Sequence, residues 1–292
     1  MKRTIFIVFA LALALTACSD MPEFIVSEVI PVIPAINDGE QIELAFAPEP
    51  EESDITAPED LAPEIVPVPE ATPEPAEMPP IEINSSRNID PARPMIALTF
   101  DDGPVGHTVQ IIELLELYDV PATFFFIGEQ VGWWDSLARR IIAQGSEIGA
   151  HSWGHADYTT LSADELKRDL QRTNAAIETA VGVSPVLFRP PYGRYNDEVQ
   201  FVTRELGMAI VNWSIDPSDW ELRDAADIYL EVMTTVHDRG ILLLHDIYAE
   251  TVAAVAMIIP ALIEQGYQIV TVSELLYYSD IALEAGVVYW QG

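Results

Sequence analysis

The sequence contains little of three things: cysteine, basic residues and long hydrophobic runs. Cys18 is the single cysteine among 292 residues, so no disulfide bond can form within one chain. Lysine and arginine number 14 against 47 aspartates and glutamates, which gives a formal net charge of −33. This charge disfavours non-specific binding to nucleic acid or anionic lipid. The apolar run near the N-terminus has about a dozen residues, too few for a transmembrane helix of about 20.

The N-terminus has the pattern of an export signal. Lys2 and Arg3 precede the apolar run, and the run ends in LTAC at residues 15–18. This ending resembles a bacterial lipobox, in which cleavage before the cysteine produces a lipid-bearing N-terminus; the alternative is an ordinary signal peptide with a chance cysteine. We expect residues 1–17 to be a lipoprotein signal peptide and Cys18 to be lipidated. The protein would then be exported and anchored to a bacterial membrane, facing the cell wall or periplasm.

Residues 18–94 are predicted to be a disordered, acidic tether. Between Ser19 and Pro94 lie 15 of the 22 prolines and 18 acidic residues, but two arginines. This composition does not bury a core, and its like charges keep the chain extended at about 3 Å per residue. Residues 95–292, with 29 acidic and 10 basic residues, are long enough to form one folded domain with a sizeable core.

Seven short apolar runs alternate with amphipathic stretches in residues 95–292. Runs of this length that are apolar at nearly every position indicate the strands of a parallel sheet covered by helices. Seven strand–helix units favour an α/β fold in the form of an incomplete, distorted (β/α)7 barrel over an open, doubly wound sheet. The predicted strands are residues 95–100, 123–128, 147–151, 186–190, 209–214, 240–245 and 267–272.

Charged and aromatic side chains gather where these strands end. In parallel α/β folds the carboxyl ends of the strands form the edge at which ligands bind. Carboxylates at the end of a buried strand cost free energy unless they have partners, so we expect these residues to have a function. The residues concerned are Asp101, Asp102, His151, His155, Arg189, Tyr192, Asp216, Asp219 and His245.

A metal site is one interpretation of two of these strand ends. His151 and His155 are four residues apart, so a single turn of backbone can direct both imidazoles at one cation, although such a pair alone is weak evidence. A carboxylate from Asp101 or Asp102 would complete a set typical of catalytic divalent-metal sites. Adjacent aspartates do not easily share one role, because their side chains diverge and like charges repel. One would bind the metal and the other act as a base, whereas capping of the next helix explains only one of them.

Five segments resemble the ordered motifs of polysaccharide deacetylases, the NodB homology domain of carbohydrate esterase family four. The segments are TFDDGP at 99–104, HSWGH at 151–155, RPPYG at 189–193, WSIDPSDW at 213–220 and LLHD at 243–246. They occur in the family's order across nearly all of residues 95–275. The resemblance implies that residues 95–292 form a metal-dependent deacetylase domain. Such a domain would hydrolyse N-acetyl groups of a β-linked amino-sugar polymer and release acetate.

The resemblance assigns a metal site and a base to particular residues. Asp102, His151 and His155 would bind a divalent ion, usually Zn²⁺ in this family, with Co²⁺ or another divalent ion as alternatives. Asp101 would be the general base that takes a proton from the attacking water. Arg189 would pair with Asp101 and keep its carboxylate in place. A structural salt bridge is the alternative role for Arg189.

The resemblance also assigns the acid and the walls of the pocket. His245 would protonate the departing amine, with Asp219 as the carboxylate that fixes its tautomer. The backbone N–H of Tyr192 would stabilise the tetrahedral oxyanion. Trp220 and Leu243 would enclose the acetyl methyl group.

Some assignments remain open at this point. Tyr192 or Trp153 could stack on a sugar ring, although aromatic residues at such places often belong to the core. His107 and His237 have no evident partner, and we expect both at the surface.

The substrate is predicted from location. An exported, lipid-anchored protein on a long tether would reach peptidoglycan, whereas chitin oligomers, an exopolysaccharide or O-acetylated xylan are alternatives within the family. A function of another class is that of a catalytically silent carbohydrate-binding lipoprotein, which the intact motifs disfavour. We expect a monomer whose partners are a glycan polymer and, through the lipid anchor, a membrane, and we expect no nucleic-acid partner.

Overall fold

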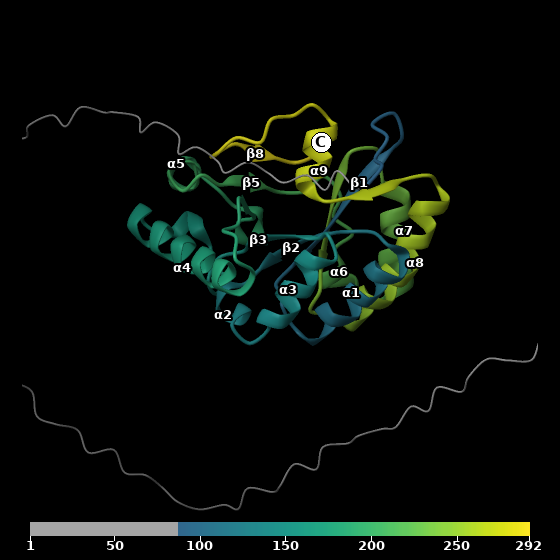
Figure 1. The fold of residues 1–292 in the computed structure, drawn as a ribbon, viewed down its shortest axis with the longest axis horizontal. Helices are drawn as coiled ribbons and strands as arrows, with labels where there is room; N and C mark the ends of the chain where they lie inside the picture. The colour runs from purple at the N-terminus through teal and green to yellow at the C-terminus, as the bar shows by residue number, and fades with distance from the viewer. Residues whose placement is uncertain (1–86) are drawn as a thin grey trace, which may run out of the picture. The chain divides into compact units, whose positions relative to one another are not determined.

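The computed structural model describes residues 87–292, which fold into a curled parallel sheet surrounded by helices (Figure 1). The described strands pair in the order β6-β1-β2-β3-β4-β5-β8, and β7 pairs with β1 outside this path. The strands are β1 (Met95–Asp101), β2 (Thr123–Phe126), β3 (Glu147–Ala150), β4 (Leu187–Phe188), β5 (Ala209–Val211), β6 (Gly240–His245), β7 (Gln268–Val270) and β8 (Val288–Tyr289). The α-helices are α1 (Gly106–Tyr118), α2 (Gly128–Val131), α3 (Asp135–Ala143), α4 (Ala163–Val181), α5 (Asp197–Glu205), α6 (Asp219–Leu222), α7 (Ala225–Thr235), α8 (Ala249–Glu264) and α9 (Val272–Tyr278), and the 3₁₀ helices are η1 (Tyr158–Thr160) and η2 (Pro191–Gly193).

The sheet closes imperfectly into a barrel. A parallel bridge between Ile215 and Leu242 connects the segment after β5 to β6. On one edge of β1, β7 pairs with residues 95–97 and β2 pairs with residues 99–101, while β6 occupies the other edge. Because two strands share one edge of β1, the ring is distorted. The predicted incomplete barrel is therefore confirmed, and all seven predicted strands are present.

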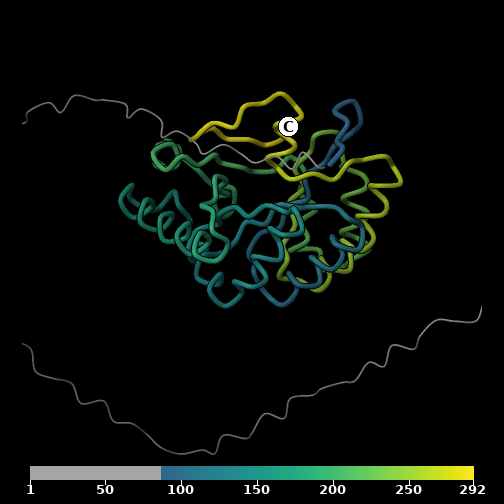
Figure 2. The backbone as a smooth tube through the Cα atoms, viewed as in Figure 1, coloured from purple at the N-terminus to yellow at the C-terminus, as the bar shows by residue number. Residues whose placement is uncertain are grey.

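The C-terminal segment occupies the gap between β5 and β6. β8 pairs with β5, and Gln291 forms an antiparallel bridge with Gly240 at the start of β6. Figure 2 shows this segment, in yellow, on the side of the sheet opposite helices α1, α3 and α4. The segment therefore supports the barrel where the main strands leave it open.

The two faces of β1 pack against different cores. Its even-numbered residues 96–100 belong to the large hydrophobic cluster that the outer helices cover, whereas Met95 and Ala97 belong to a smaller cluster with β7 and α9. Side chains alternate along a strand, so Thr99 and Asp101 point to the same inner side as Met95 and Ala97. The alternation thus places the Asp101 carboxylate inside the barrel at the carboxyl end of β1.

The helix that follows the second motif has clear end signals in the sequence. At its start, Ser162 and Glu165 form a capping box, which satisfies backbone N–H groups of the first turn. At its end, Gly182 has φ of 85°, a left-handed conformation that glycine adopts without steric cost. Within α4, Asp169 accepts a hydrogen bond of 2.8 Å from the Trp153 backbone N–H, which ties the helix to the histidine-bearing loop after β3.

The described chain begins with a segment that contacts the barrel. Arg87 forms an ion pair of 2.6 Å with Glu274, and the backbone N–H of Asp90 donates to Gln268 Oε1 at 2.8 Å. The predicted signal peptide, Cys18 and most of the predicted tether lie outside the described residues. None of the helices in residues 87–292 has the length and apolar character needed to cross a membrane.

Candidate active site

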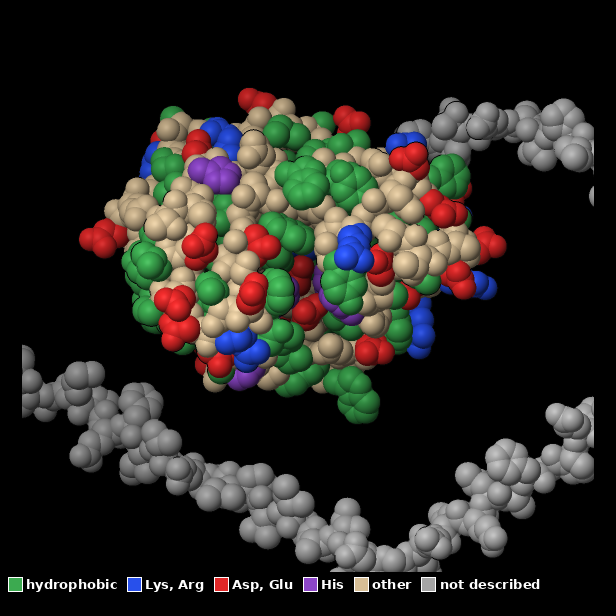
Figure 3. Space-filling model, turned by 180° about the vertical axis from the view of Figure 1, so that it is seen from behind, with side chains coloured by type: hydrophobic (Ala, Val, Ile, Leu, Met, Phe, Trp, Pro, Cys, Tyr) green, Lys and Arg blue, Asp and Glu red, His purple; other side chains and the backbone are tan. Residues whose placement is uncertain are grey.

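The five motifs meet in one cavity at the carboxyl ends of the strands. The cavity has a volume of about 450 Å³. On the face shown in Figure 3, acidic and histidine side chains lie at the bottom of a hollow with hydrophobic side chains around it. The residues that line the cavity are Asp101, Asp102, His151, His155, Tyr192, Trp213, Asp216, Trp220, Leu243, His245 and Tyr248.

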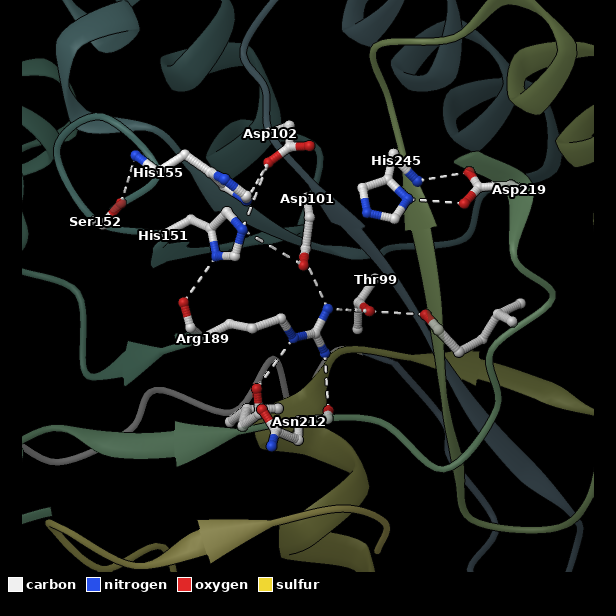
Figure 4. A network of polar contacts seen from close by, with 12 residues as sticks. Thr99, Asp101, Asp102, His151, Ser152, His155, Arg189, Asn212, Asp219 and His245 are labelled. Atoms are coloured by element: carbon white, nitrogen blue, oxygen red, sulfur yellow. Dashed lines mark hydrogen bonds and ion pairs between the residues drawn. The ribbon is translucent and has the colours of Figure 1, made fainter. Parts of the chain in front are cut away.

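The Asp101 carboxylate is held by a buried guanidinium. Arg189 is fully buried, and its Nη1 donates to Asp101 Oδ1 at 2.8 Å and to Thr99 Oγ1 at 2.7 Å. Its Nε and Nη2 donate to the backbone carbonyls of Val211 and Asn212 at 3.0 and 2.9 Å. A buried guanidinium is tolerated only when its donors have partners, and four of the five N–H groups of Arg189 donate here. The predicted pairing of Arg189 with Asp101 is therefore present, and it fixes the carboxylate in one orientation (Figure 4).

Asp102, His151 and His155 converge on one point. Asp102 Oδ1 lies 3.5 Å from Nε2 of His151 and 3.3 Å from Nε2 of His155. The Nδ1 of His151 lies 2.7 Å from the Arg189 carbonyl oxygen, which can only accept a hydrogen bond. Nδ1 therefore carries the proton, and the lone pair of Nε2 faces Asp102.

The charge states of this cluster suit a cation. Burial raises the pKa of the Asp102 carboxyl, but the three histidines around it together outweigh burial and hold that pKa below its ordinary value. Burial lowers the pKa of His155, and the neighbouring His151 lowers it further. Metal ligands must be deprotonated, so the lowered pKa values of Asp102 and His155 both favour binding of a cation.

The geometry of the cluster also fits a divalent metal. Asp102 Oδ1 is buried and accepts no hydrogen bond from the described residues. The three ligand atoms lie within 4.8 Å of one another. Two ligands of a tetrahedral zinc ion, each about 2.0–2.1 Å from the metal, are about 3.3 Å apart. The distances of 3.3 and 3.5 Å from Asp102 are close to this value.

Strained backbone positions these ligands. Asp102 and His155 have φ of 74° and 62°, in the left-handed region, and so does Tyr192 with 61°. This conformation costs a residue with a side chain about 1–3 kcal/mol, so the surrounding structure must impose it. Its presence at three cavity residues indicates that the fold maintains the site at the expense of local stability.

His245 lies at the end of β6 and is held by Asp219. The fully buried Asp219 accepts hydrogen bonds from His245 Nδ1 at 2.7 Å, from the His245 backbone N–H at 2.8 Å and from Thr251 Oγ1 at 2.7 Å. Burial disfavours the imidazolium, but the hydrogen bond and charge of Asp219 outweigh it and raise the pKa of His245 to about 9. His245 is therefore protonated at neutral pH, with its Nε2–H free to face the cavity.

Aromatic and apolar side chains form the walls of the cavity. Trp220 is half-exposed and Leu243 is buried, and both line the cavity as predicted. The Tyr192 ring is exposed and contacts His155 edge-on at 4.6 Å between centroids. Trp153 does not line the cavity, because its ring packs against Gly128 and lies under the Arg172 guanidinium at 3.5 Å. Of the two predicted sugar-stacking candidates, the geometry favours Tyr192.

One residue that lines the cavity, Tyr248, was not predicted from the sequence, whereas Asp216 was among the strand-end residues expected to have a function. Tyr248 follows His245 by three residues, lines the cavity, and stacks under the Arg223 guanidinium at 3.9 Å. Its place just after the fifth motif is a weak signal, because aromatic residues at such places often belong to the core. Asp216 also lines the cavity while it accepts a hydrogen bond of 2.8 Å from the Ser218 backbone N–H.

Comparisons with known proteins agree with this geometry. Residues 88–211 match the family model of polysaccharide deacetylases. Over 196 residues the chain is 40% identical to the peptidoglycan-N-acetylmuramic acid deacetylase PdaC of Bacillus subtilis, covering 67% of this chain and 41% of PdaC. Over 190 residues it is 40% identical to the peptidoglycan-N-acetylglucosamine deacetylase of Bacillus cereus, covering 63% of this chain and 89% of that protein. The chain thus spans less than half the length of PdaC.

Solved structures show the same fold. The structure of PdaC superposes with a TM-score of 0.63 at 40% identity, covering 66% of this chain and 94% of that one. A family 4 acetyl xylan esterase from Clostridium thermocellum in complex with a cobalt ion gives a TM-score of 0.63 at 31% identity, covering 68% and 98%. The motifs, the fold and these similarities agree: the chain belongs to the polysaccharide deacetylase family, carbohydrate esterase family four.

Proposed function

We propose that the protein is a metal-dependent deacetylase that hydrolyses N-acetyl groups of a β-linked amino-sugar polymer, with peptidoglycan as the substrate. One observation carries the proposal. The Asp101 carboxylate, held by Arg189, and the His245 imidazole, held by Asp219, face the same cavity as the cluster of Asp102, His151 and His155. In Figure 4, Asp101 and Asp102 lie between the His151–His155 pair and His245. Amide hydrolysis needs a base for water, a charge acceptor for the carbonyl oxygen and an acid for the leaving nitrogen, and these groups can supply all three.

In this proposal Asp102, His151 and His155 hold the divalent ion, with zinc preferred and cobalt as a substitute. A divalent ion at such a site polarises the amide carbonyl and lowers the pKa of a water molecule. This role is supported by the Asp102 Oδ1, which has no hydrogen-bond partner among the described residues, and by the lowered pKa of His155. The Arg189 carbonyl oxygen fixes the tautomer of His151, which would leave the Nε2 lone pair available to the ion.

The chain's own groups then move two protons. The Asp101 carboxylate accepts a proton from water as the water oxygen adds to the carbonyl carbon, and Arg189 balances the carboxylate charge. The tetrahedral oxyanion accepts a hydrogen bond from the backbone N–H of Tyr192. The C–N bond breaks as His245 Nε2 donates its proton to the nitrogen, which leaves as the sugar amine while acetate forms. Asp219 holds His245 in the orientation and protonation state that this last transfer needs.

The walls of the cavity would select an acetylated sugar. Trp220 and Leu243 provide the apolar surface on which the acetyl methyl group would rest. The exposed ring of Tyr192 and the partly buried ring of Tyr248 both line the cavity and are suited to stacking on sugar faces, since aromatic rings offer flat apolar surface. A cavity of about 450 Å³ that opens to solvent would admit one residue of a polymer while the chain continues outside.

Peptidoglycan is proposed as the substrate because relatives with 40% identity are named peptidoglycan deacetylases and because the N-terminus predicts export. In this proposal Cys18 carries a lipid, and the protein acts as a monomer anchored to a bacterial membrane on its acidic tether. Mass spectrometry of the mature N-terminus tests the anchor. An unmodified N-terminus at any residue other than Cys18 would refute it.

The function is tested by acetate release from three substrates. The full chain, purified in detergent and supplied with zinc or cobalt, is incubated with peptidoglycan, chitin oligomers and acetyl-xylan, with Asp101→Asn and His245→Ala as controls. We expect acetate from peptidoglycan with the wild-type chain and little with either variant. Release from chitin oligomers or xylan alone would reassign the substrate. No release from any substrate with metal bound would instead support a silent carbohydrate-binding protein.

A further inference from the structure

A second aspartate at the end of β6 has no role in the steps above. Asp246 follows His245 directly, and its side chain is fully buried. Its Oδ2 accepts a hydrogen bond of 2.6 Å from Thr108 Oγ1 in the first turn of α1, and its backbone N–H donates to the Asp101 carbonyl oxygen at 3.3 Å. A buried carboxylate is costly, and an apolar residue would fill this space at lower cost. The position of Asp246 therefore calls for another reason.

The reason lies in the turn between β1 and α1. A Cβ atom added to Gly103 would lie 2.3 Å from Asp246 Oδ2 and 2.7 Å from Oδ1, so the carboxylate fills the space that a side chain at Gly103 would take. The residue just before Gly103 is Asp102, whose φ of 74° is unfavourable for a residue with a side chain. Such a conformation persists only when its surroundings impose it. Asp246 is the side chain that packs against the next residue of the turn.

Thr108 extends this contact to both ends of the turn. Its hydroxyl donates to Asp246 and accepts a hydrogen bond of 2.8 Å from the Val105 backbone N–H. The turn from Asp102 to Val105 is thus tied at Gly103 by packing and at Val105 through Thr108, and both ties lead to Asp246. The carboxylate connects the turn that carries Asp102 to the strand that carries His245.

We propose that Asp246 is a positioning residue that holds Asp102 in its left-handed conformation, so that the Asp102 carboxylate meets His151 and His155. This inference rests on the proposed function only in taking Asp102, His151 and His155 as metal ligands. Burial raises the pKa of Asp246 to about 7. Asparagine has the same shape and keeps an acceptor for the Thr108 hydroxyl, so it is expected to serve in place of Asp246 if packing and hydrogen bonding, and not charge, hold the turn.

Zinc affinity of the full chain tests the proposal without any substrate. Zinc binding to the metal-free protein is measured by competition with a chromophoric chelator for wild type, Asp246→Ala and Asp246→Asn. Residues that orient metal ligands typically contribute about 10–100-fold to affinity, so we expect a loss of that size in Asp246→Ala. Asp246→Asn keeps the shape of the side chain and an acceptor for Thr108. Its zinc affinity is therefore expected to stay within about threefold of the wild-type affinity, a much smaller change than the loss in Asp246→Ala.

A matched control separates positioning from general loss of stability. Leu262→Ala removes a buried side chain of α8 that belongs to the hydrophobic core and not to the cavity, and it is expected to destabilise the fold without changing zinc affinity. If Asp246→Ala does not fold, Thr108→Ala is expected to lower zinc affinity and Thr108→Ser to restore it.

Three outcomes would overturn the proposal. The first is an unchanged zinc affinity in Asp246→Ala, or in Thr108→Ala if Asp246→Ala does not fold. The second is a loss of zinc affinity in Leu262→Ala as large as in Asp246→Ala. The third is a zinc affinity of Asp246→Asn as low as that of Asp246→Ala. A wild-type chain that binds no zinc would refute the proposed function itself.

Discussion

Replacing Asp219 by asparagine tests the role of His245 as the acid without changing the metal ligands or the base. Asp219 accepts three hydrogen bonds, one from the His245 ring and two, on Oδ2, from the His245 backbone and Thr251. Asparagine has one acceptor oxygen, and the two donors at Oδ2 favour placing it there. The amide NH₂ would then face His245 Nδ1, which removes the stabilisation of the imidazolium and favours the wrong tautomer.

The size of the effect follows from the pKa of His245. In the native site Asp219 raises this pKa to about 9 against the opposing effect of burial. Without the Asp219 carboxylate, burial still lowers this pKa while Asp101 and Asp102 still raise it, so the pKa is expected near the ordinary value of about 6.5. At pH 8 the protonated fraction then falls from about 90% to about 3%, a loss of about 30-fold, whereas at pH 6 the loss from this cause is under about twofold.

The assay is the pH dependence of kcat/KM for acetate release, which reports the ionisation of the free protein. A group that must be protonated gives a rate that is full below its pKa and falls as the pH rises through it. The falling alkaline limb should therefore lie near pH 9 in wild type and move to about pH 6.5 in Asp219→Asn. An alkaline limb at the same pH in both proteins would refute the role of His245 as the acid that Asp219 keeps protonated.

Three further predictions concern the metal cluster and the base. Asp102→Ala should lose zinc affinity in a chelator competition, whereas Asp101→Asn should keep the metal and lose turnover by a factor of about a hundred or more; equal loss of metal in both would contradict this division of roles. Arg189→Met leaves the buried Asp101 charge unpaired and should lower the free energy of unfolding in urea by about 3–5 kcal/mol, and a change below about 1 kcal/mol would contradict the account of this pair. Removal of the metal with a chelator should abolish acetate release and added zinc should restore it, so activity that persists without metal would contradict the metal-dependent reaction.

Much of the barrel was predictable because its strands are short apolar runs between amphipathic helices. β1 and β6, the longest strands, match the predicted ranges to within one residue. Their pairing could not be predicted in detail. That β2 and β7 share one edge of β1, and that β8 pairs with β5, depends on packing between residues far apart in sequence, for which short apolar runs carry no register signal.

The site was predictable where chemistry restricts residue type and less so where packing decides. The paired groups Asp101 with Arg189 and His245 with Asp219 were expected, and the structure contains both contacts. The left-handed backbone of Asp102 had no sequence signal, because aspartate rarely adopts it without tertiary contacts. Asp246 belongs to the fifth motif, but its contact with Gly103 arises only when the ends of β1 and β6 lie side by side.

The central claim is that this site cleaves an amide bond of a cell-wall sugar. The most direct measurement is mass spectrometry of the glycan fragments of peptidoglycan after incubation with the zinc-loaded chain, together with acetate quantified in the same sample. The account predicts one new free amine on a sugar for each acetate released, and neither product with Asp101→Asn. Acetate without new amines, or neither product from a wild-type chain with zinc bound, would contradict it.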